Sequence, residues 1–256
     1  DGCSATKGII IGAYDEVTDE PGPAYAQILD NRAKLPNLKG LFLGEATGEE
    51  SEISWIEHED VTEFLNACPG LEDLRVRGNG ISIQPSRHIS LKRLVFESGG
   101  LPSAVIDSVA GSVFPEMEHL EIYCGTENYG WDGSIDNLKP LLENNPFPKL
   151  KYLGLRNCEV ANELAAAAAN APVLDQIETL DLSLGNMQDE GGQQLLASEK
   201  IKQLKKLDLH HHYFSDAVVS QFLSLGIEVD VSDQSQPDIW EHNGEQHVDY
   251  YISVTE

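Results

Sequence analysis

The sequence predicts an α/β solenoid with parallel strands along its concave face and mainly helices on its convex face. Two observations predict this fold: a short apolar motif recurs in one frame along most of the 256 residues, and most copies are followed by a segment with a helical pattern. Hydrophobic residues make up 41% of the chain, an ordinary share for a protein with a packed core. No run of 18 apolar residues is present, so we expect no transmembrane helix.

The recurring motif is L-x-x-L-x-L, the signature of a leucine-rich-repeat solenoid, or horseshoe. Its clear copies are Leu38–Leu43, Leu71–Val76, Leu91–Phe96, Met117–Ile122, Leu150–Leu155, Ile177–Leu182 and Leu204–Leu209. Degenerate copies lie at Ile9–Ile11 and Ile227–Val231. Central positions 41, 74, 94, 120, 153, 180, 207 and 229 lie 20 to 33 residues apart. Alternation within L-x-L puts both apolar side chains on one face of a short strand, so stacked copies form one continuous core.

The segments between the motifs are expected to return over the other side of the sheet as helices. Their predicted spans are 60–65, 135–142, 162–170, 190–197 and 215–223, with Asp60, Ser134, Asp189 and Ser215 as N-caps. Residues 164–169 are almost pure alanine, and such small side chains let a helix lie close to the sheet.

The repeats resemble the ribonuclease-inhibitor type of leucine-rich repeat. Its consensus has Asn or Cys at the third residue after the last apolar residue of the L-x-x-L-x-L motif. Asn79 and Cys158 occupy that position here, and other copies have Gly99, Gly185 or His212. Longer blocks, such as Leu153–Asn157 and Leu180–Gly185, resemble a family of bacterial leucine-rich-repeat proteins of unassigned function. The resemblance runs from about Gly8 to Asp233. It implies bacterial origin and a cytoplasmic location, and it brings no catalytic residues.

Two regions are predicted: a repeat domain over residues 1–232, with about eight or nine repeats, and a capping tail over 233–256. Residues 248–254 alternate weakly and are expected to form a last strand that covers the open edge of the sheet. An apolar strand begins within ten residues of the start, where a solenoid usually has a polar cap. We therefore expect a longer protein with a preceding segment.

Residues between the strand leucines face the concave side in rows, one residue for each strand. The first row reads Phe42, Arg75, Val95, Glu121, Gly154, Asp181, Asp208 and Asp230, and Gly154 is expected to leave a dent. The second row reads Gly44, Arg77, Glu97, Tyr123, Arg156, Ser183, His210 and Ser232. The predicted partner-binding residues are Arg75, Arg77, Glu121, Tyr123, Arg156, Asp181, Ser183, Asp208, His210 and Asp230.

Three aspartates of the first row are expected to lie side by side at the C-terminal end. Neighbouring carboxylates repel, so the sequence predicts either a strip that docks a basic partner or an ordinary polar face in an acidic chain. His210, His211 and His212 follow, but alternation sends neighbours to opposite faces. His210 with Asp208 or Asp181 remains an alternative metal site, whereas His212 is placed to bond turn backbone.

Two insertions add further candidates. Residues 45–60 are acidic and contain Trp55 between Ile53 and Ile56, which either pins the loop to the body or forms an aromatic lip. Residues 124–131 carry Tyr129 and Trp131, to which the same two interpretations apply.

The charge excludes some partner classes. With 43 acidic and 17 basic residues, the formal net charge is -26, which opposes nucleic acid and anionic membranes and favours basic proteins. Four scattered cysteines have no zinc spacing and are expected to be free thiols. No enzyme motif is present. The sequence thus predicts a non-catalytic protein-binding module without a cofactor. The alternatives are a metal-dependent enzyme or metal-binding protein using Asp181, Asp208 and His210, or a scaffold for the preceding segment.

Overall fold

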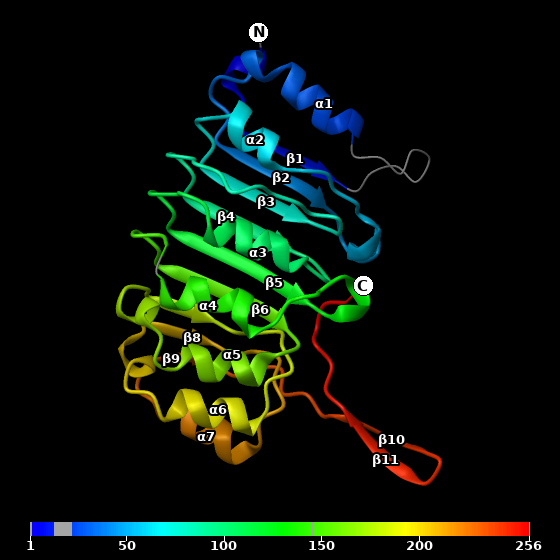
Figure 1. Cartoon of the computed structure of the whole chain (residues 1–256), viewed down its shortest axis with the longest axis vertical. Coiled ribbons are helices and arrows are strands. Elements are labelled where there is room, and N and C mark those ends of the chain that lie inside the picture. The colour runs from blue at the N-terminus through cyan, green and yellow to red at the C-terminus, as the bar shows by residue number, and fades with distance from the viewer. Residues whose placement is uncertain (1, 13–21, 145, 256) are drawn as a thin grey trace.

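The computed structural model of the protein describes residues 2–12, 22–144 and 146–255. Residues 1 and 256, the outer bounds of the two predicted regions, lie outside this range, as do 13–21 and 145. Nine parallel strands form one sheet in sequence order (Figure 1). They are β1 (Gly8–Gly12), β2 (Gly40–Glu45), β3 (Asp73–Arg77), β4 (Arg93–Glu97), β5 (His119–Gly125), β6 (Tyr152–Cys158), β7 (Thr179–Asp181), β8 (Lys206–Asp208) and β9 (Glu228–Asp230).

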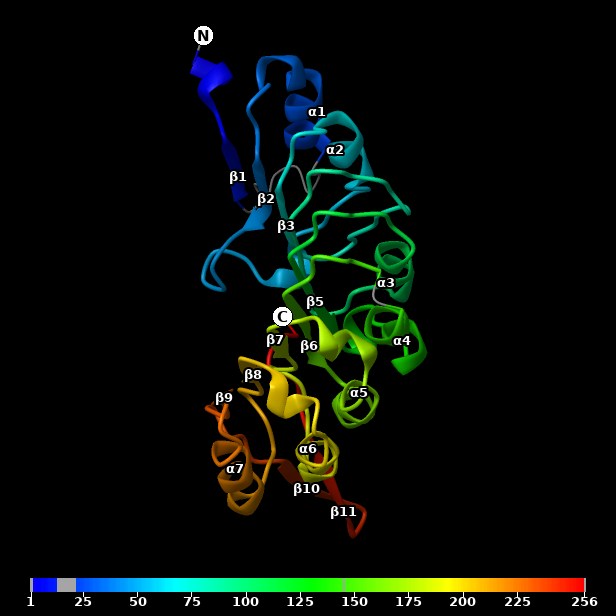
Figure 2. The same ribbon diagram turned by 90° about the vertical axis from the view of Figure 1, so that its left-hand side faces the viewer.

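The return segments place helices on the outside of the curved sheet, as Figure 2 shows. They are α1 (Gly22–Asp30), α2 (Thr62–Ala67), α3 (Ser103–Ala110), α4 (Ile135–Glu143), α5 (Ala161–Ala168), α6 (Asp189–Leu196) and α7 (Asp216–Leu223). The predicted α/β leucine-rich-repeat horseshoe is therefore confirmed, with parallel strands inside and mainly helices outside. Five of these helices match the predicted ones to within two residues at their N-termini, whereas α1 and α3 were not predicted.

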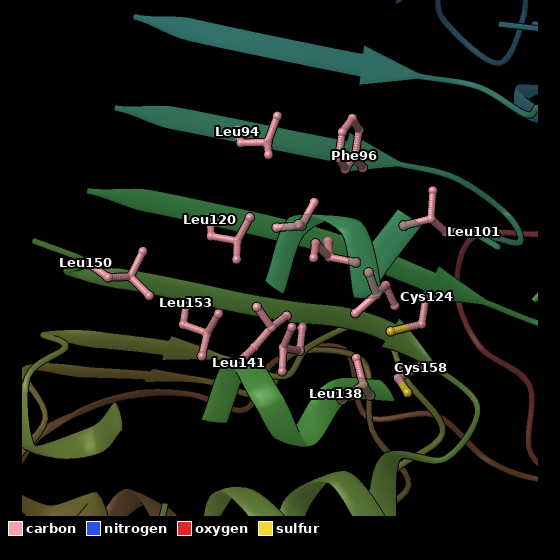
Figure 3. Close-up of a cluster of buried hydrophobic side chains, with 14 of the residues drawn as sticks. Leu94, Phe96, Leu101, Leu120, Cys124, Leu138, Leu141, Leu150, Leu153 and Cys158 are labelled. Carbon is pink, nitrogen blue, oxygen red and sulfur yellow. The ribbon is translucent and has the colours of Figure 1, made fainter. Parts of the chain in front are cut away.

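Strand register stacks equivalent leucines directly on one another. The central residues pair in the order Leu41, Leu74, Leu94, Leu120, Leu153, Leu180, Leu207 and Val229. Figure 3 shows part of the resulting core, in which Leu120 and Leu153 of the sheet face Leu138 and Leu141 of α4. All four side chains are buried, so each repeat contributes to one uninterrupted apolar core.

A row of alternating charge runs along the amino edge of the same sheet. Ion pairs join Lys39 to Glu72, Glu72 to Lys92, Glu118 to Lys151, and Glu178 to Lys205, with N···O distances of 2.7 to 3.5 Å. Each exposed pair contributes at most about 1 kcal/mol. In the observed register these opposite charges lie on neighbouring strands, so the row adds a small electrostatic stabilisation to the stack.

The predicted N-caps act in different ways. Ser134 forms a full capping box with Asn137 at the start of α4, as expected. Asp60 accepts the backbone N–H of Thr62 at 2.8 Å, although Val61 is the N-cap of α2. Gln188 is the N-cap of α6, and Asp189 instead accepts the N–H of Ser215 from the next repeat at 2.7 Å. Ser215 is the N-cap of α7 but makes no capping hydrogen bond through its side chain.

His212 lies at the Asn/Cys consensus position and has the predicted structural role. It is 1% exposed, and its Nδ1 accepts the N–H of Phe214 at 3.1 Å. Its Nε2 then carries the proton and donates to the carbonyl of Val231 at 3.0 Å. Burial lowers the pKa of His212, which favours this neutral form.

The prediction that the tail covers the open edge of the sheet is wrong. Strands β10 (Asp238–His242) and β11 (Glu245–Asp249) form an antiparallel hairpin that projects from the body (Figure 1). Residues 250–255, which we call the strap, then run back past the carboxyl ends of the strands. The Asn157 side chain makes two hydrogen bonds to the backbone of Val254, of 2.6 and 2.9 Å. The edge of β9 has no pairing partner among the described strands.

Truncating a central leucine should destabilise the whole solenoid. Leu153 of β6 is fully buried, and we expect Leu153→Ala to lower the free energy of unfolding by about 2 to 5 kcal/mol. Urea denaturation followed by circular dichroism measures this change. Lys151→Ala, two residues away at an exposed ion pair, should change it by no more than about 1 kcal/mol. Similar losses in both variants would contradict the continuous core.

Candidate functional site

The concave face carries the predicted rows strand by strand. Phe42, Arg75, Val95, Glu121, Gly154, Asp181, Asp208 and Asp230 are paired neighbours in the ladder. In the second row, Arg77 pairs with Glu97, and Tyr123 pairs with Arg156. The sequence therefore predicted the members of the first row and these two pairs of the second correctly.

Accessibility differs from the prediction for half of the proposed partner-binding residues. Glu121, Tyr123, Asp181, Ser183 and Asp208 are all buried, with exposed fractions of 0 to 8%. The polar side-chain atoms of Glu121, Asp181, Ser183 and Asp208 are engaged by neighbouring side chains, and the ring of Tyr123 lies under Arg156, so little of their surface is left for a partner. They support the concave surface from within, and the more accessible members of the predicted set are Arg75, Arg77, Arg156, His210 and Asp230.

Glu121 lies at the centre of a charged network in the middle of the face. Its carboxylate accepts from Arg156 Nη1 at 2.6 Å and from His119 Nε2 at 3.0 Å, and Arg93 Nη2 lies 3.7 Å away. Burial alone would raise the pKa of Glu121, but the hydrogen bond from His119 and the charge of Arg156 outweigh it and lower the pKa to about 2. Glu121 is therefore a permanent anion at neutral pH.

Arg156 joins this network to the next strand. Its Nε lies 3.3 Å from Asp181 Oδ2 and donates to Ser183 Oγ at 2.9 Å, and its guanidinium lies 4.9 Å from the ring centre of Tyr123. Tyr152 donates to Asp181 Oδ2 at 2.5 Å. Burial, followed by the charge of Asp181, raises the pKa of Tyr152, so its hydroxyl stays protonated. These side chains form one connected network, which we call the concave lattice. Its members are Arg93, His119, Glu121, Tyr123, Tyr152, Arg156, Asp181 and Ser183.

The dent predicted at Gly154 is filled by its neighbours. A Cβ placed on Gly154 would lie 3.0 Å from Cε1 of Tyr152 and 3.3 Å from Cγ of Glu121. The Tyr152 ring also stacks on the His119 ring, with centroids 3.9 Å apart. Glycine at this position therefore makes room for the aromatic side chain of its own strand rather than for a ligand.

A third row, one step before the first, was missed in the sequence. Its members are Gly40, Asp73, Arg93, His119, Tyr152, Thr179, Lys206 and Glu228, paired in that order. The period-two alternation that gave the other rows extends to these positions, so the signal was present. This row shares with the second row the donors to the buried carboxylates of the first: it supplies His119 to Glu121, Tyr152 to Asp181 and Lys206 to Asp208.

The N-terminal end of the face is more open and more apolar. A shallow hollow of about 230 Å³ lies over β1 to β3, lined by residues that include Ile10, Phe42 and Arg75. Ile10 is 68% exposed. Arg75 forms an ion pair with Asp73 of its own strand at 3.1 Å, and Arg77 forms one with Glu97 at 2.9 Å. The two arginines thus keep fixed orientations beside the hollow.

The three C-terminal aspartates do not form a bare acidic strip. Asp181 is held by Arg156 and Tyr152, and Asp208 by Lys206 Nζ at 2.9 Å and His210 Nδ1 at 2.7 Å. Asp230 accepts hydrogen bonds from the Oγ and N–H of Ser232. The charge repulsion expected from the sequence is therefore offset by cations inside the face at Asp181 and Asp208, whereas the hydrogen-bond partner of Asp230 is a neutral serine.

The same geometry changes which residues could hold a metal ion. Among the described residues, Asp208, His210 and Asp230 offer ligand atoms within 4.8 Å of one another, whereas Asp181, included in the prediction, is engaged elsewhere. The Lys206 ammonium already supplies positive charge to Asp208. That arrangement favours a closed ion-pair network over a metal centre, because a second cation would have to displace lysine or lie against it.

The aromatic residues of the two predicted insertions differ in exposure. In the first, Ile53 and Ile56 are buried while Trp55 is 69% exposed, so the isoleucines pin the loop and the tryptophan faces outward. In the second, Trp131 is 2% exposed and belongs to the core. Tyr129, at the end of the short η4 turn (Glu127–Tyr129), lines a surface groove.

A sheet of in-register leucine strands with helices outside defines a leucine-rich-repeat protein. This chain is similar to a Bacteroides fragilis protein of known crystal structure, with a TM-score of 0.87 and 35% sequence identity. The match covers 99% of this chain and 69% of the other. The chain belongs to the family of that protein. The TLR13–ssRNA13 complex is 14% identical with a TM-score of 0.46, over 91% of this chain and 33% of that one. An internalin from Listeria monocytogenes is 16% identical with a TM-score of 0.33, over 82% and 71%.

Scans of protein-family models and of curated proteins give no match. Among the helices of the described residues, none is both long and apolar enough to span a membrane.

The low pKa of Glu121 predicts a specific loss of stability in acid. Its folded pKa of about 2 lies below 4.5, the ordinary value for a glutamate, so its contribution to stability is complete above about pH 4.5 and is lost as the pH falls towards 2. We expect the wild-type free energy of unfolding to fall across this window by on the order of 2 to 3 kcal/mol more than that of Glu121→Gln. Urea titrations at several pH values measure the difference.

Glu63→Gln, which changes an exposed carboxylate on α2, should keep the wild-type slope. An unchanged slope in Glu121→Gln would show that the lattice does not hold this carboxylate ionised.

Proposed function

We propose that the protein is a non-catalytic binding module that holds a protein partner on its concave face. The observation that carries the proposal is the distribution of basic residues. The chain has six arginines and eleven lysines. Four arginines, Arg75, Arg77, Arg93 and Arg156, lie at concave-row positions, and among the described strand residues Lys206 is the single lysine in these rows. Protein interfaces are enriched in arginine and aromatic residues and depleted in lysine.

The fixed geometry of the face supports the same function. The concave lattice holds its arginine, histidine and tyrosine side chains by hydrogen bonds and stacking, so they lose little freedom when a partner binds. Next to the lattice, Ile10 and Phe42 provide apolar surface in the hollow over β1 to β3. An apolar anchor site beside a rigid polar surface is the usual composition of a hot spot and its rim.

The chemistry of the partner is less restricted than the sequence suggested. The buried carboxylates of the face are neutralised internally, so the face itself does not require a basic partner. The net charge of -26 still opposes nucleic acid and anionic lipid, and a protein remains the proposed partner class.

Photocrosslinking tests whether the concave face is the site of contact. A benzoylphenylalanine at Phe42 should crosslink one discrete protein in lysate of the source cells, because this ring lines the concave hollow. The same group at Leu223, which is 65% exposed on α7, should not crosslink that protein. Equal crosslinking from both positions would contradict the proposal. No product from Phe42 with a full-length chain would favour the scaffold role.

Paired arginine variants then measure the energetic role of the face with the crosslinked protein as ligand. Arg75→Ala with Arg93→Ala should weaken its binding about tenfold or more, as truncation of interface hot spots does. The matched control, Arg32→Ala with Arg87→Ala, removes the two arginines that lie outside the concave rows and should change affinity by less than about twofold. Isothermal titration calorimetry gives both values. Equal losses in the two double variants would assign the effect to net charge rather than to this face.

A further inference from the structure

A groove of about 410 Å³ lies beside the concave face, at the carboxyl edge of the sheet. One wall is the insertion after β5, including Glu127 and Tyr129, and the other is the strap, including Tyr250 and Tyr251. A second hollow of about 360 Å³ adjoins it and shares Glu127 and Glu159. Figure 1 shows the end of the chain next to the ends of β5 and β6. The groove therefore joins segments more than a hundred residues apart in the sequence.

Both walls are fixed by contacts with the body of the repeat domain. The insertion is anchored by Trp131, which is buried in the core, and by the backbone N–H of Thr126, which donates to the carbonyl of Gly99 at 2.9 Å. The strap is held where Ser253 N–H donates to the carbonyl of Leu184 at 2.9 Å and where Ile252 is 6% exposed. The shape of the groove is thus set before a ligand arrives, which lowers the entropy cost of binding.

Tyrosines and unneutralised carboxylates line this space. The rings of Tyr129, Tyr250 and Tyr251 contribute to its walls, and Tyr250 is held edge-on by Tyr213 with centroids 5.0 Å apart. No lysine or arginine is among the described residues that line either hollow. Burial raises the pKa of Glu159. A hydrogen bond from the Glu127 backbone opposes this rise, whereas the charge of the Glu127 carboxylate adds to it. These two carboxylates differ from Glu121, Asp181 and Asp208 of the concave face, each of which has a cation beside it.

We propose that this groove binds the side chain of an arginine or lysine presented by a protein partner. A guanidinium or ammonium group placed between Glu127 and Glu159 would relieve their mutual repulsion, and the tyrosine faces would add cation–π attraction. Asn128 and Asn186 offer amide groups for the peptide backbone on either side of that residue. The volume lies in the range of small-ligand sites and accommodates a side chain with its flanking peptide groups. The inference rests on the proposed function in one respect, namely that a protein partner presents the arginine or lysine.

Nuclear magnetic resonance titration of the whole protein with three defined probes tests this assignment. The probes are acetyl-Gly-Arg-Gly-amide, the same peptide with neutral citrulline in place of arginine, and propylguanidinium, which has the same single charge as the arginine peptide. We expect the arginine peptide to shift the backbone amides of residues 126–130 and 250–255. Citrulline should weaken binding at least about tenfold, because the charge-assisted hydrogen bonds are lost. Propylguanidinium should bind more weakly than the arginine peptide, because it lacks the peptide groups.

Matched variants separate the groove from general attraction to an acidic protein. Glu127→Gln with Glu159→Gln should weaken binding of the arginine peptide about tenfold or more. Glu63→Gln with Glu190→Gln removes the same charge from exposed helix positions and should leave the affinity unchanged. Amide spectra that are otherwise unaltered show that the variants are folded.

Three results would overturn the proposal: equal affinity for the arginine and citrulline peptides, equal losses in both double variants, or equal affinity for propylguanidinium and the peptide. The last would assign the groove to a small guanidinium compound. Each of these leaves crosslinking at Phe42 unaffected, so a failure here is distinct from a failure of the concave face.

Discussion

The register of the parallel ladder is the constraint on which the rest of the structure depends. Leu120 lies directly beside Leu153, and Leu153 lies beside Leu180. All the remaining positions of each strand are therefore also fixed beside their counterparts on the next strand. A slip of one residue would turn the core leucines towards solvent and bury the charged rows. Packing of the leucines therefore determines the pattern of charges on the concave face, although none of the described residues in its three rows is a leucine.

This constraint has an electrostatic consequence. Stacking repeats with aspartate at one position brings like charges together on neighbouring strands, as with Asp181 and Asp208. The chain offsets this repulsion from adjacent rows: Arg156 follows the first row on β6, and Lys206 precedes it on β8. The result is a face whose charges are already paired. A partner on such a face gains from shape, apolar contact and arginine hydrogen bonds more than from neutralising net charge.

Sequence periodicity was sufficient for the fold and for the membership of the concave rows, because both follow from local alternation and one repeat length. It was insufficient for accessibility, which depends on neighbours brought together from different repeats. Asp181 is polar and at a surface-facing position, yet it is buried because Tyr152 and Arg156 close over it. Trp55 shows the converse, since its apolar neighbours Ile53 and Ile56 take the buried positions and leave the largest ring exposed. The path of the tail was also beyond prediction, because side chains of the body such as Asn157 and Tyr213 hydrogen-bond to its backbone, and these contacts leave little trace in the sequence pattern of the tail.

The strap also explains why glycine is required at the carboxyl edge of the sheet. A Cβ on Gly99 would lie 2.3 Å from the carbonyl oxygen of Thr255, and one on Gly100 would lie 2.2 Å from the backbone of Tyr129. Gly125 has a φ of +85°, and a Cβ there would meet the backbone of Gly99. These three glycines let the strap, the insertion and the strand ends approach within backbone contact. The walls of the groove are therefore part of the folded solenoid rather than loosely attached segments, and a site formed there is as preorganised as the concave lattice beside it.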